Sequence, residues 1–174
     1  MSKFATDLSH IEAVIFDVDG VLSRTTTIMN ASGEPMRTAN VRDGYAIKEA
    51  CRCGIVVGII SGAVADNIPK RYAPLGVEHI YMGQASKRAA LDHFVEVTGI
   101  PLEHIIFCGD DIPDLAVMQS CGCAIAPLDA APEVKAIAHQ ILPVEGGEGV
   151  ARLVLEELLK MKGLWLQDRA AYEW

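Results

Sequence analysis

Two aspartates separated by one residue, Asp17 and Asp19, are the first side chains in the sequence that could do chemistry. They follow a short apolar run, and Gly20 directly after them permits a sharp turn. In an extended segment, side chains two residues apart point to the same side, roughly 6–7 Å apart at about 3.3 Å per residue. A phosphoryl group fits between two such carboxylates if one is a nucleophile and the other a proton donor. Asp17 and Asp19 are therefore candidate catalytic residues.

A calcium-binding loop of the EF-hand type also begins with Asp-x-Asp. The positions that must supply further calcium ligands in such a loop are occupied here by Val21 and Ile28, which excludes it. An acidic turn without chemistry stays open for this segment taken alone. The choice depends on what the rest of the chain brings near Asp17.

Three further aspartates, Asp110, Asp111 and Asp114, follow another apolar run, residues 105–108. If they face the same crevice as the first pair, these carboxylates repel one another unless a cation neutralises them. Mg²⁺ suits this set, because it binds one or two carboxylates together with the phosphate oxygens of a substrate. One aspartate could instead cap a helix that begins near Pro113, but capping does not account for five acids at two strand ends.

Two other segments could hold a phosphate group. Ser61 and Gly62 offer a hydroxyl and an unobstructed backbone N–H at the expected start of a helix, although a plain serine cap is an equal alternative. Lys87 follows Ser86 at another helix start, where the helix dipole opposes a cation. A lysine there needs an anion, either a bound phosphate or the neighbouring aspartates, unless it is simply solvated.

Short apolar runs alternate with helical patterns, and these elements must position the candidate residues. The runs predict strands at 13–16, 55–60, 77–82, 105–108 and 123–126. Apolar spacing predicts helices at 45–53, 63–75, 86–98, 112–120, 132–138 and 149–161. This alternation predicts an α/β fold with a doubly wound, Rossmann-like parallel sheet. Ligands bind beyond the carboxyl ends of the strands in such sheets, which is where the candidate segments fall.

Residues 1–174 are expected to form a single domain, because no linker divides a chain of this length. Residues 23–40 interrupt the alternation and predict a β-hairpin flap, with its turn at Ser32-Gly33, over the carboxyl edge of the sheet. The glycine-rich segment 146–149 lacks the Gly-Lys-Ser/Thr of a nucleotide-binding P-loop and predicts a flexible connector. The tail, residues 162–174, holds both tryptophans and is expected to pack on its own subunit or on a neighbour.

The net charge of −8 argues against nucleic acid and anionic membranes as partners, because both need clustered lysine and arginine. Apolar residues make up 51% of the chain, which fits a sheet buried on both faces and a further apolar surface buried between subunits. No apolar run approaches the roughly 18 residues of a membrane helix. Five cysteines, an odd number, and a first segment without a signal peptide indicate reduced thiols in the cytoplasm.

Four segments in order resemble the motifs of the haloacid-dehalogenase superfamily of phosphatases: residues 17–21, Ser61-Gly62, Lys87 and residues 109–114. The gaps between these motifs leave room for the flap and short helices but not for a cap domain. The chain therefore resembles the capless branch, whose subunits close one another's active sites in a homotetramer.

The resemblance implies a role for each motif residue. Asp17 attacks phosphorus and forms an aspartyl-phosphate, while Asp19 acts as general acid and then as general base. The implied Mg²⁺ ligands are Asp17, the backbone carbonyl of Asp19, and Asp110. The implied phosphate ligands are Ser61, Gly62 and Lys87. The implied outer residues are Asp111, which orients Lys87 or a metal-bound water, and Asp114.

Within the capless branch, the resemblance extends to phosphatases that release an eight-carbon sugar acid for lipopolysaccharide synthesis. It is carried by residues 33–35, 40–45, 81–84 and 146–149, followed by Arg152. The implied substrate-binding residues, some of them reaching across a subunit boundary, are Asp19, Asn40, Val41, Arg42, Asp43, Gly44, Lys48 and Arg71. Relatives that act on nine-carbon, sialic-acid-like phosphates often carry an acid where Ala63 stands, so the eight-carbon substrate is favoured. The alternatives are a phosphatase of a nine-carbon keto-acid phosphate and a non-catalytic module used for assembly or as a receiver.

Overall fold

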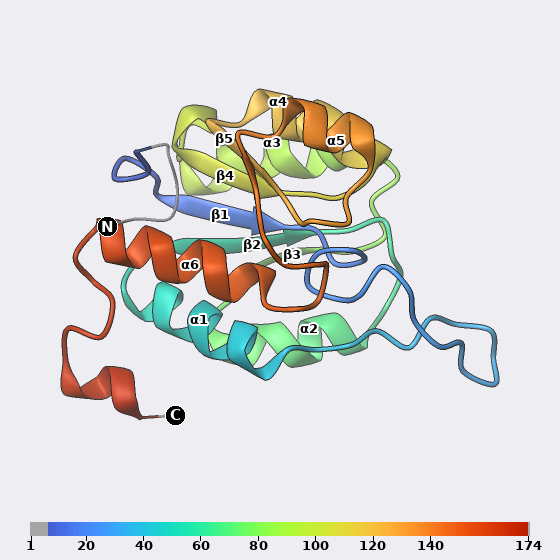
Figure 1. Ribbon diagram of the computed structural model, residues 1–174, viewed down its shortest axis with the longest axis horizontal. Coiled ribbons are helices and arrows are strands. Elements are labelled where there is room, and N and C mark those ends of the chain that lie inside the picture. Colours follow the sequence, from blue (N-terminus) through green and yellow to red (C-terminus); the bar gives the residue numbers. More distant parts are fainter. Residues whose placement is uncertain (1–6, 174) are drawn as a thin grey trace.

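Six parallel strands form the sheet of the computed structural model, which describes residues 7–173 (Figure 1). The strands are β1 (Ala13–Phe16), β2 (Val56–Ile60), β3 (His79–Tyr81), β4 (Ile105–Cys108), β5 (Cys123–Ala126) and β6 (Gln140–Ile141). Their order is β3-β2-β1-β4-β5-β6, so the chain winds outward from β1 in both directions. The doubly wound parallel sheet expected from the sequence is confirmed. The first six residues, in which the sequence predicts no export signal, and Trp174 of the tail lie outside the described residues.

Helices cover both faces of this sheet (Figure 1). One face carries α1 (Val41–Arg52), α2 (Asn67–Tyr72) and α6 (Val150–Met161), and the other carries α3 (Lys87–Thr98), α4 (Leu115–Ser120) and α5 (Pro132–Ile137). Short 3₁₀ turns lie at η1 (Ala73–Leu75), η2 (Leu102–His104), η3 (Ile112–Asp114) and η4 (Arg169–Tyr172). None of the helices in residues 7–173 has the length and apolar content to span a bilayer.

Alternation along β1 builds a core on each face of the sheet. Val14 and Phe16 belong to the core on the side of α1 and α6, whereas Ala13 and Ile15 belong to the core under α3 and α4. All four side chains are fully buried. The high apolar content of the sequence is thus accounted for by strands buried on both faces, as is typical of parallel sheets.

Two helices start at other residues than the sequence predicts. α1 begins at Val41 rather than at residue 45, because the Asn40 side chain accepts two backbone N–H groups of its first turn, at 2.9 and 3.4 Å. α2 begins only at Asn67, so the predicted start at 63 is wrong; the carbonyl of Ala63 instead accepts the N–H of Gly83 at 2.8 Å. The edge strand β6 was not predicted, since two residues make no apolar run.

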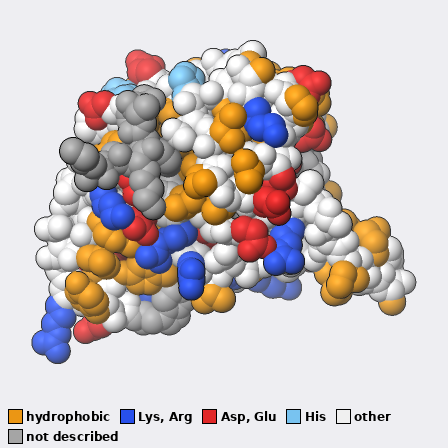
Figure 2. All heavy atoms as spheres, in the orientation of Figure 1, with side chains coloured by type: hydrophobic (Ala, Val, Ile, Leu, Met, Phe, Trp, Pro, Cys, Tyr) orange, Lys and Arg blue, Asp and Glu red, His pale blue; other side chains and the backbone are white. Residues whose placement is uncertain are grey.

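Residues 23–40 form the expected flap, and the predicted β-hairpin is present in it as a short one: the N–H of Asn30 donates to the Glu34 carbonyl at 2.9 Å and the N–H of Met36 to the Ile28 carbonyl at 2.8 Å, on either side of the turn at Ser32-Gly33. Within the described chain, the flap contains one antiparallel bridge, between Met29 and Pro35. The turn is held by the Asn30 side chain, which accepts two backbone N–H groups at 2.9 Å each. The flap projects from the body of the molecule and carries hydrophobic side chains near its tip, among them Ile28, which is 72% exposed (Figures 1 and 2).

The described part of the tail packs back on its own subunit. Trp165 contacts Tyr45 edge-on, with ring centroids 6.0 Å apart, and the guanidinium of Arg152 lies 4.9 Å from the centre of the Trp165 ring. The Tyr45 hydroxyl donates a hydrogen bond to the carbonyl of Ala171. This is the first of the two arrangements expected for the tail, and its contact with a neighbouring subunit stays a prediction.

A buried carboxylate, Asp43 of α1, joins α1 to α6. Its side chain is only 1% exposed, and its Oδ1 accepts the backbone N–H of Arg152 in the first turn of α6 at 2.7 Å. Its Oδ2 has no hydrogen-bond partner within residues 7–173. Burial raises the pKa of Asp43 to about 6, outweighing the hydrogen bonds from α6 that act in the opposite direction. Asp43 therefore holds its proton to a higher pH in the folded protein than in the unfolded chain.

Asp43→Asn keeps an acceptor for α6 and removes the charge. The folded wild type holds a proton on Asp43 that the unfolded chain releases at lower pH, so its free energy of unfolding should fall relative to that of the variant as the pH rises from about 4 to about 6. The shift limits this relative change to about 3 kcal/mol. Urea unfolding of both proteins across that range measures it, and a difference that does not vary with pH would contradict the assignment.

Candidate active site

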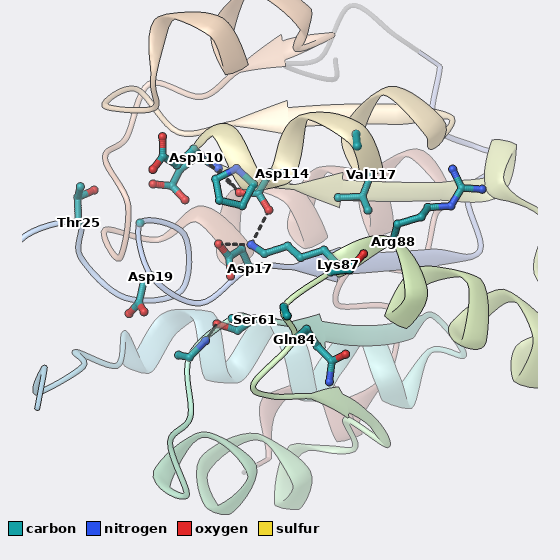
Figure 3. A pocket seen from close by; sticks show the side chains of 18 residues that line it. Asp17, Asp19, Thr25, Ser61, Gln84, Lys87, Arg88, Asp110, Asp114 and Val117 are labelled. Carbon is teal, nitrogen blue, oxygen red and sulfur yellow. Dashed lines mark hydrogen bonds and ion pairs between the residues drawn. The ribbon is translucent and has the colours of Figure 1, made fainter.

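A cavity of about 660 Å³ opens beyond the carboxyl ends of the strands (Figure 3). Its walls come from the loops that follow β1, β2, β3 and β4, which are distant in sequence and adjacent in the sheet. It contains the predicted catalytic, metal-binding and phosphate-binding residues and the two outer acids: Asp17, Asp19, Ser61, Gly62, Lys87, Asp110, Asp111 and Asp114. The structure thus brings these eight residues together.

The register of β1 against β4 sets two acidic loops side by side. Phe16 lies opposite Cys108, and the backbone N–H of Asp17 donates to the Cys108 carbonyl at 3.0 Å. Neighbouring strands are only about 4.8 Å apart, so side chains that leave both strand ends on one side must meet. One oxygen from each of Asp17, Asp110 and Asp114 lies within 4.8 Å of the others.

Glycines make this close approach possible. Gly20 turns the chain with a φ of +78°, and a side chain at this position would collide with the carboxylate of Asp110. On its other side, Gly146 lies against the Gly20 carbonyl without space for a Cβ, and the N–H of Gly147 donates to the Val21 carbonyl at 2.8 Å. The prediction of a flexible connector at this glycine-rich segment is wrong, because it packs against the loop that carries Asp17 and Asp19.

Lys87, the first residue of α3, lies buried between two of the acids. Its Nζ is 2.7 Å from Asp17 Oδ2 and 2.6 Å from Asp114 Oδ1 (Figure 3). The neighbouring aspartates are the anions that a cation at a helix start requires, which excludes the alternative of a solvated lysine. Burial alone would lower the pKa of Lys87, but these two carboxylates raise it, so the lysine stays charged.

One lysine does not neutralise three buried carboxylates. Burial and the charge on Asp114 raise the pKa of Asp17 to about 6, against the opposing effect of Lys87. Burial, Asp17 and Asp114 raise the pKa of Asp110 to about 8. Such shifts mark an excess of negative charge that a divalent cation would relieve. Carboxylate oxygens are also the donors that Mg²⁺ prefers, so this donor set fits that metal.

Asp114 and Asp111 differ in what they contact. Asp114 is fully buried; its Oδ1 accepts from Lys87, and its Oδ2 accepts the N–H of Asp110 at 3.0 Å. The Asp111 side chain is bound instead to the backbone of the η3 turn as part of a capping box. Of the two roles expected for Asp111, orienting Lys87 belongs to Asp114, whereas orienting a metal-bound water stays a prediction for Asp111.

Ser61 follows β2 and is buried in the cavity wall. Its hydroxyl accepts the N–H of Ala63 at 3.2 Å, and its carbonyl accepts the N–H of Gln84 at 3.0 Å. The plain helix-cap alternative is excluded, because α2 starts further along the chain with Asp66 as its N-cap. The loop structure leaves the Ser61 hydroxyl and the Gly62 backbone at the cavity.

Asp19 pairs with a residue that the sequence analysis missed. Both oxygens of its carboxylate accept hydrogen bonds from Arg37 of the flap, each at 2.8 Å. No local signal marks Arg37, because its position over the Asp17 loop depends on how the flap folds back.

The structure does not bring the remaining predicted substrate-binding residues into this cavity. Asn40, Val41 and Arg42 line a different hollow beside α6, and Lys48 lines one beside the tail. Asp43 is buried against α6, and the guanidinium of Arg71 lies against Gly44 of α1. Contacts of these residues with a substrate held by a neighbouring subunit stay predictions.

Comparison with known proteins agrees with this geometry. A family model of haloacid dehalogenase-like hydrolases matches residues 70–154. The chain is 38% identical over 158 residues to 3-deoxy-D-manno-octulosonate 8-phosphate phosphatase KdsC of Salmonella typhi, covering 91% of this chain and 84% of that protein. The protein of the same name from Escherichia coli K12 is 38% identical over 154 residues, covering 88% and 82%.

Solved structures give the same result. The phosphatase of this name from Yersinia pestis has a TM-score of 0.86 at 34% identity, over 90% of this chain and 85% of that one. The one from Moraxella catarrhalis, in complex with a magnesium ion, a phosphate ion and a KDO molecule, has a TM-score of 0.85 at 32% identity, over 90% of each chain. The chain belongs to the 3-deoxy-D-manno-octulosonate 8-phosphate phosphatase family of haloacid dehalogenase-like hydrolases.

Proposed function

We propose that this protein is a Mg²⁺-dependent phosphatase that hydrolyses 3-deoxy-D-manno-octulosonate 8-phosphate to the free sugar acid and phosphate in lipopolysaccharide precursor synthesis. The observation that carries the proposal is the buried group formed by Asp17, Asp110, Asp114 and Lys87 at the ends of β1 and β4. The substrate named for the relatives supports the choice of ester. The carboxylates and the ammonium of this buried group support phosphoryl transfer.

In the first step Asp17 is the nucleophile. A carboxylate oxygen of Asp17 attacks phosphorus, the bond from phosphorus to the sugar oxygen breaks, and an aspartyl-phosphate forms. Asp19, two residues further on, gives its proton to the departing sugar oxygen. Water then attacks phosphorus, Asp19 takes the proton of that water, and Asp17 is released as a carboxylate. A carboxylate at position 19 thus favours hydrolysis over a long-lived phosphoenzyme.

The other groups of the site balance charge. Lys87, held by Asp114, presents its ammonium beside Asp17, where phosphate oxygens arrive. The hydroxyl of Ser61 and the N–H of Gly62 bind further phosphate oxygens. Asp17, Asp110 and the backbone carbonyl of Asp19 would hold Mg²⁺, whose positive charge would offset that of a carboxylate facing a phosphate.

We propose that the working form is a cytoplasmic homotetramer. Exposed apolar side chains on the flap, Ile28, Met29 and Met36, are 72%, 57% and 50% exposed in the single chain. Burial of such side chains between subunits stabilises an assembly. The same contact would carry Arg42, Lys48 or Arg71 to a neighbouring cavity, where cations suit the carboxylate and hydroxyls of a sugar acid.

A substrate panel tests this function. Phosphate release is measured from the octulosonate 8-phosphate, a nine-carbon keto-acid 9-phosphate and D-arabinose 5-phosphate, each with Mg²⁺ or with EDTA. We expect the highest kcat/KM on the octulosonate ester and none of this turnover in EDTA. A higher kcat/KM on the nine-carbon ester would make that ester the substrate in place of the octulosonate. Inactivity on all three esters would support a non-catalytic module.

Asp17→Asn tests the nucleophile. The amide is a far weaker nucleophile than a carboxylate, so kcat should fall by at least ~10³-fold, while far-UV circular dichroism and elution volume stay those of the wild type. Asp92→Asn is the matched control, because Asp92 lies outside the cavity in an exposed pair with Arg88. Near-full activity of Asp17→Asn would show that the nucleophile is misassigned.

A further inference from the structure

Arg37 of the flap covers the carboxylate of Asp19. Its Nε and Nη2 each donate a hydrogen bond of 2.8 Å, one to each carboxylate oxygen. The Arg37 side chain is 9% exposed, whereas that of Asp19 is 49% exposed. The pair therefore has one buried member, fixed in the flap, and one member on the wall of the cavity.

The next residue of the flap fixes Arg37 in this position. The backbone N–H of Thr38 donates to Ser23 Oγ at 2.9 Å, and Thr38 Oγ1 accepts the N–H of Arg24 at 3.0 Å. Ser23 itself is buried directly after the loop that carries Asp19. An isolated surface pair contributes about 0–1 kcal/mol, but a two-bond pair with a buried, tethered guanidinium holds a defined geometry.

This geometry keeps Asp19 away from the position that its proposed role requires. In Figure 3 the Asp19 side chain points away from the group formed by Asp17, Lys87 and Asp114. A general acid must come within hydrogen-bond reach of the leaving oxygen, which lies on the far side of the phosphorus from Asp17. Asp19 must therefore be released from Arg37, or share it, once the substrate is bound.

A second carboxylate could release Asp19 without leaving a charge unpaired. The guanidinium binds one carboxylate through two parallel bonds, so an incoming carboxylate replaces Asp19 with equal charge and the same geometry. The substrate of the proposed function carries a carboxylate, whereas a simple sugar phosphate has none. Arg24 of the same flap has an exposed side chain and pairs with Glu148 at 2.6 Å, not with Asp19, so an exchange at Arg24 would not release Asp19.

We propose that Arg37 is a specificity-determining residue that exchanges Asp19 for the carboxylate of a sugar-acid substrate. The inference rests on the proposed function. It adds a physical reason why the enzyme would reject phosphates of sugars that lack a carboxylate. Arg37 holds Asp19 out of line, and a substrate without a carboxylate leaves it there. A sugar-acid phosphate binds Arg37 and frees Asp19 to reach the leaving oxygen.

The test compares kcat/KM for 3-deoxy-D-manno-octulosonate 8-phosphate and D-arabinose 5-phosphate in wild type, Arg37→Gln, Arg37→Lys and the control Arg24→Gln. Loss of a charge-assisted bond should lower kcat/KM of Arg37→Gln on the octulosonate by roughly 10- to 100-fold. The same variant should match or exceed the wild type on D-arabinose 5-phosphate, because Asp19 is no longer held. Arg37→Lys should recover part of the octulosonate activity, and Arg24→Gln should keep the wild-type preference.

The outcomes separate this inference from the proposed function. A fall of equal size on both substrates would overturn the exchange and make Arg37 a residue that only positions Asp19. Unchanged kinetics on both substrates would overturn any role for the pair. Inactivity of the wild type on the octulosonate ester would instead overturn the proposed function, and the inference with it. Circular dichroism of each variant shows whether a loss reflects misfolding, in which case Arg37→Lys decides.

Discussion

The crowding of buried negative charge at the ends of β1 and β4 is the constraint on which the rest of this structure depends. Asp17, Asp110 and Asp114 offer oxygens within 4.8 Å of one another, and Lys87 supplies a single positive charge. Burial and the neighbouring acids raise the pKa of Asp17 to about 6 and that of Asp110 to about 8, because proton uptake relieves part of this excess negative charge. A bound cation and a phosphate ester turn this unfavourable arrangement into a site for phosphoryl transfer.

The surrounding elements maintain that crowding. The parallel register of β1 and β4 sets the separation of the loops, and Gly20 leaves space for the Asp110 carboxylate. The glycine-rich segment before α6 supports the first loop from the other side, and Asp114 fixes Lys87. The flap adds Arg37, the contact that controls Asp19. These contacts thus hold together side chains whose charges would otherwise repel one another.

Much of this arrangement could be predicted from the sequence because the signals are local. Apolar runs mark the strands, and the polar residues after them gather at one edge in any parallel sheet, which places Asp17, Ser61, Lys87 and Asp110 together. The misses share a different origin. The pairing of Arg37 with Asp19, the choice of Asp114 over Asp111 beside Lys87, and the packing of Gly146 on Gly20 all depend on loop packing that spacing does not encode.

Calorimetric titration of Mg²⁺ at several pH values tests the central claim most directly. Because protons compete with the metal for Asp17 and Asp110, we predict that Mg²⁺ affinity rises at least tenfold between about pH 6 and about pH 8, with release of protons. Asp110→Asn should weaken binding and flatten this dependence. Affinity that is independent of pH, or unchanged in Asp110→Asn, would contradict the view that these buried carboxylates exist to hold a cation.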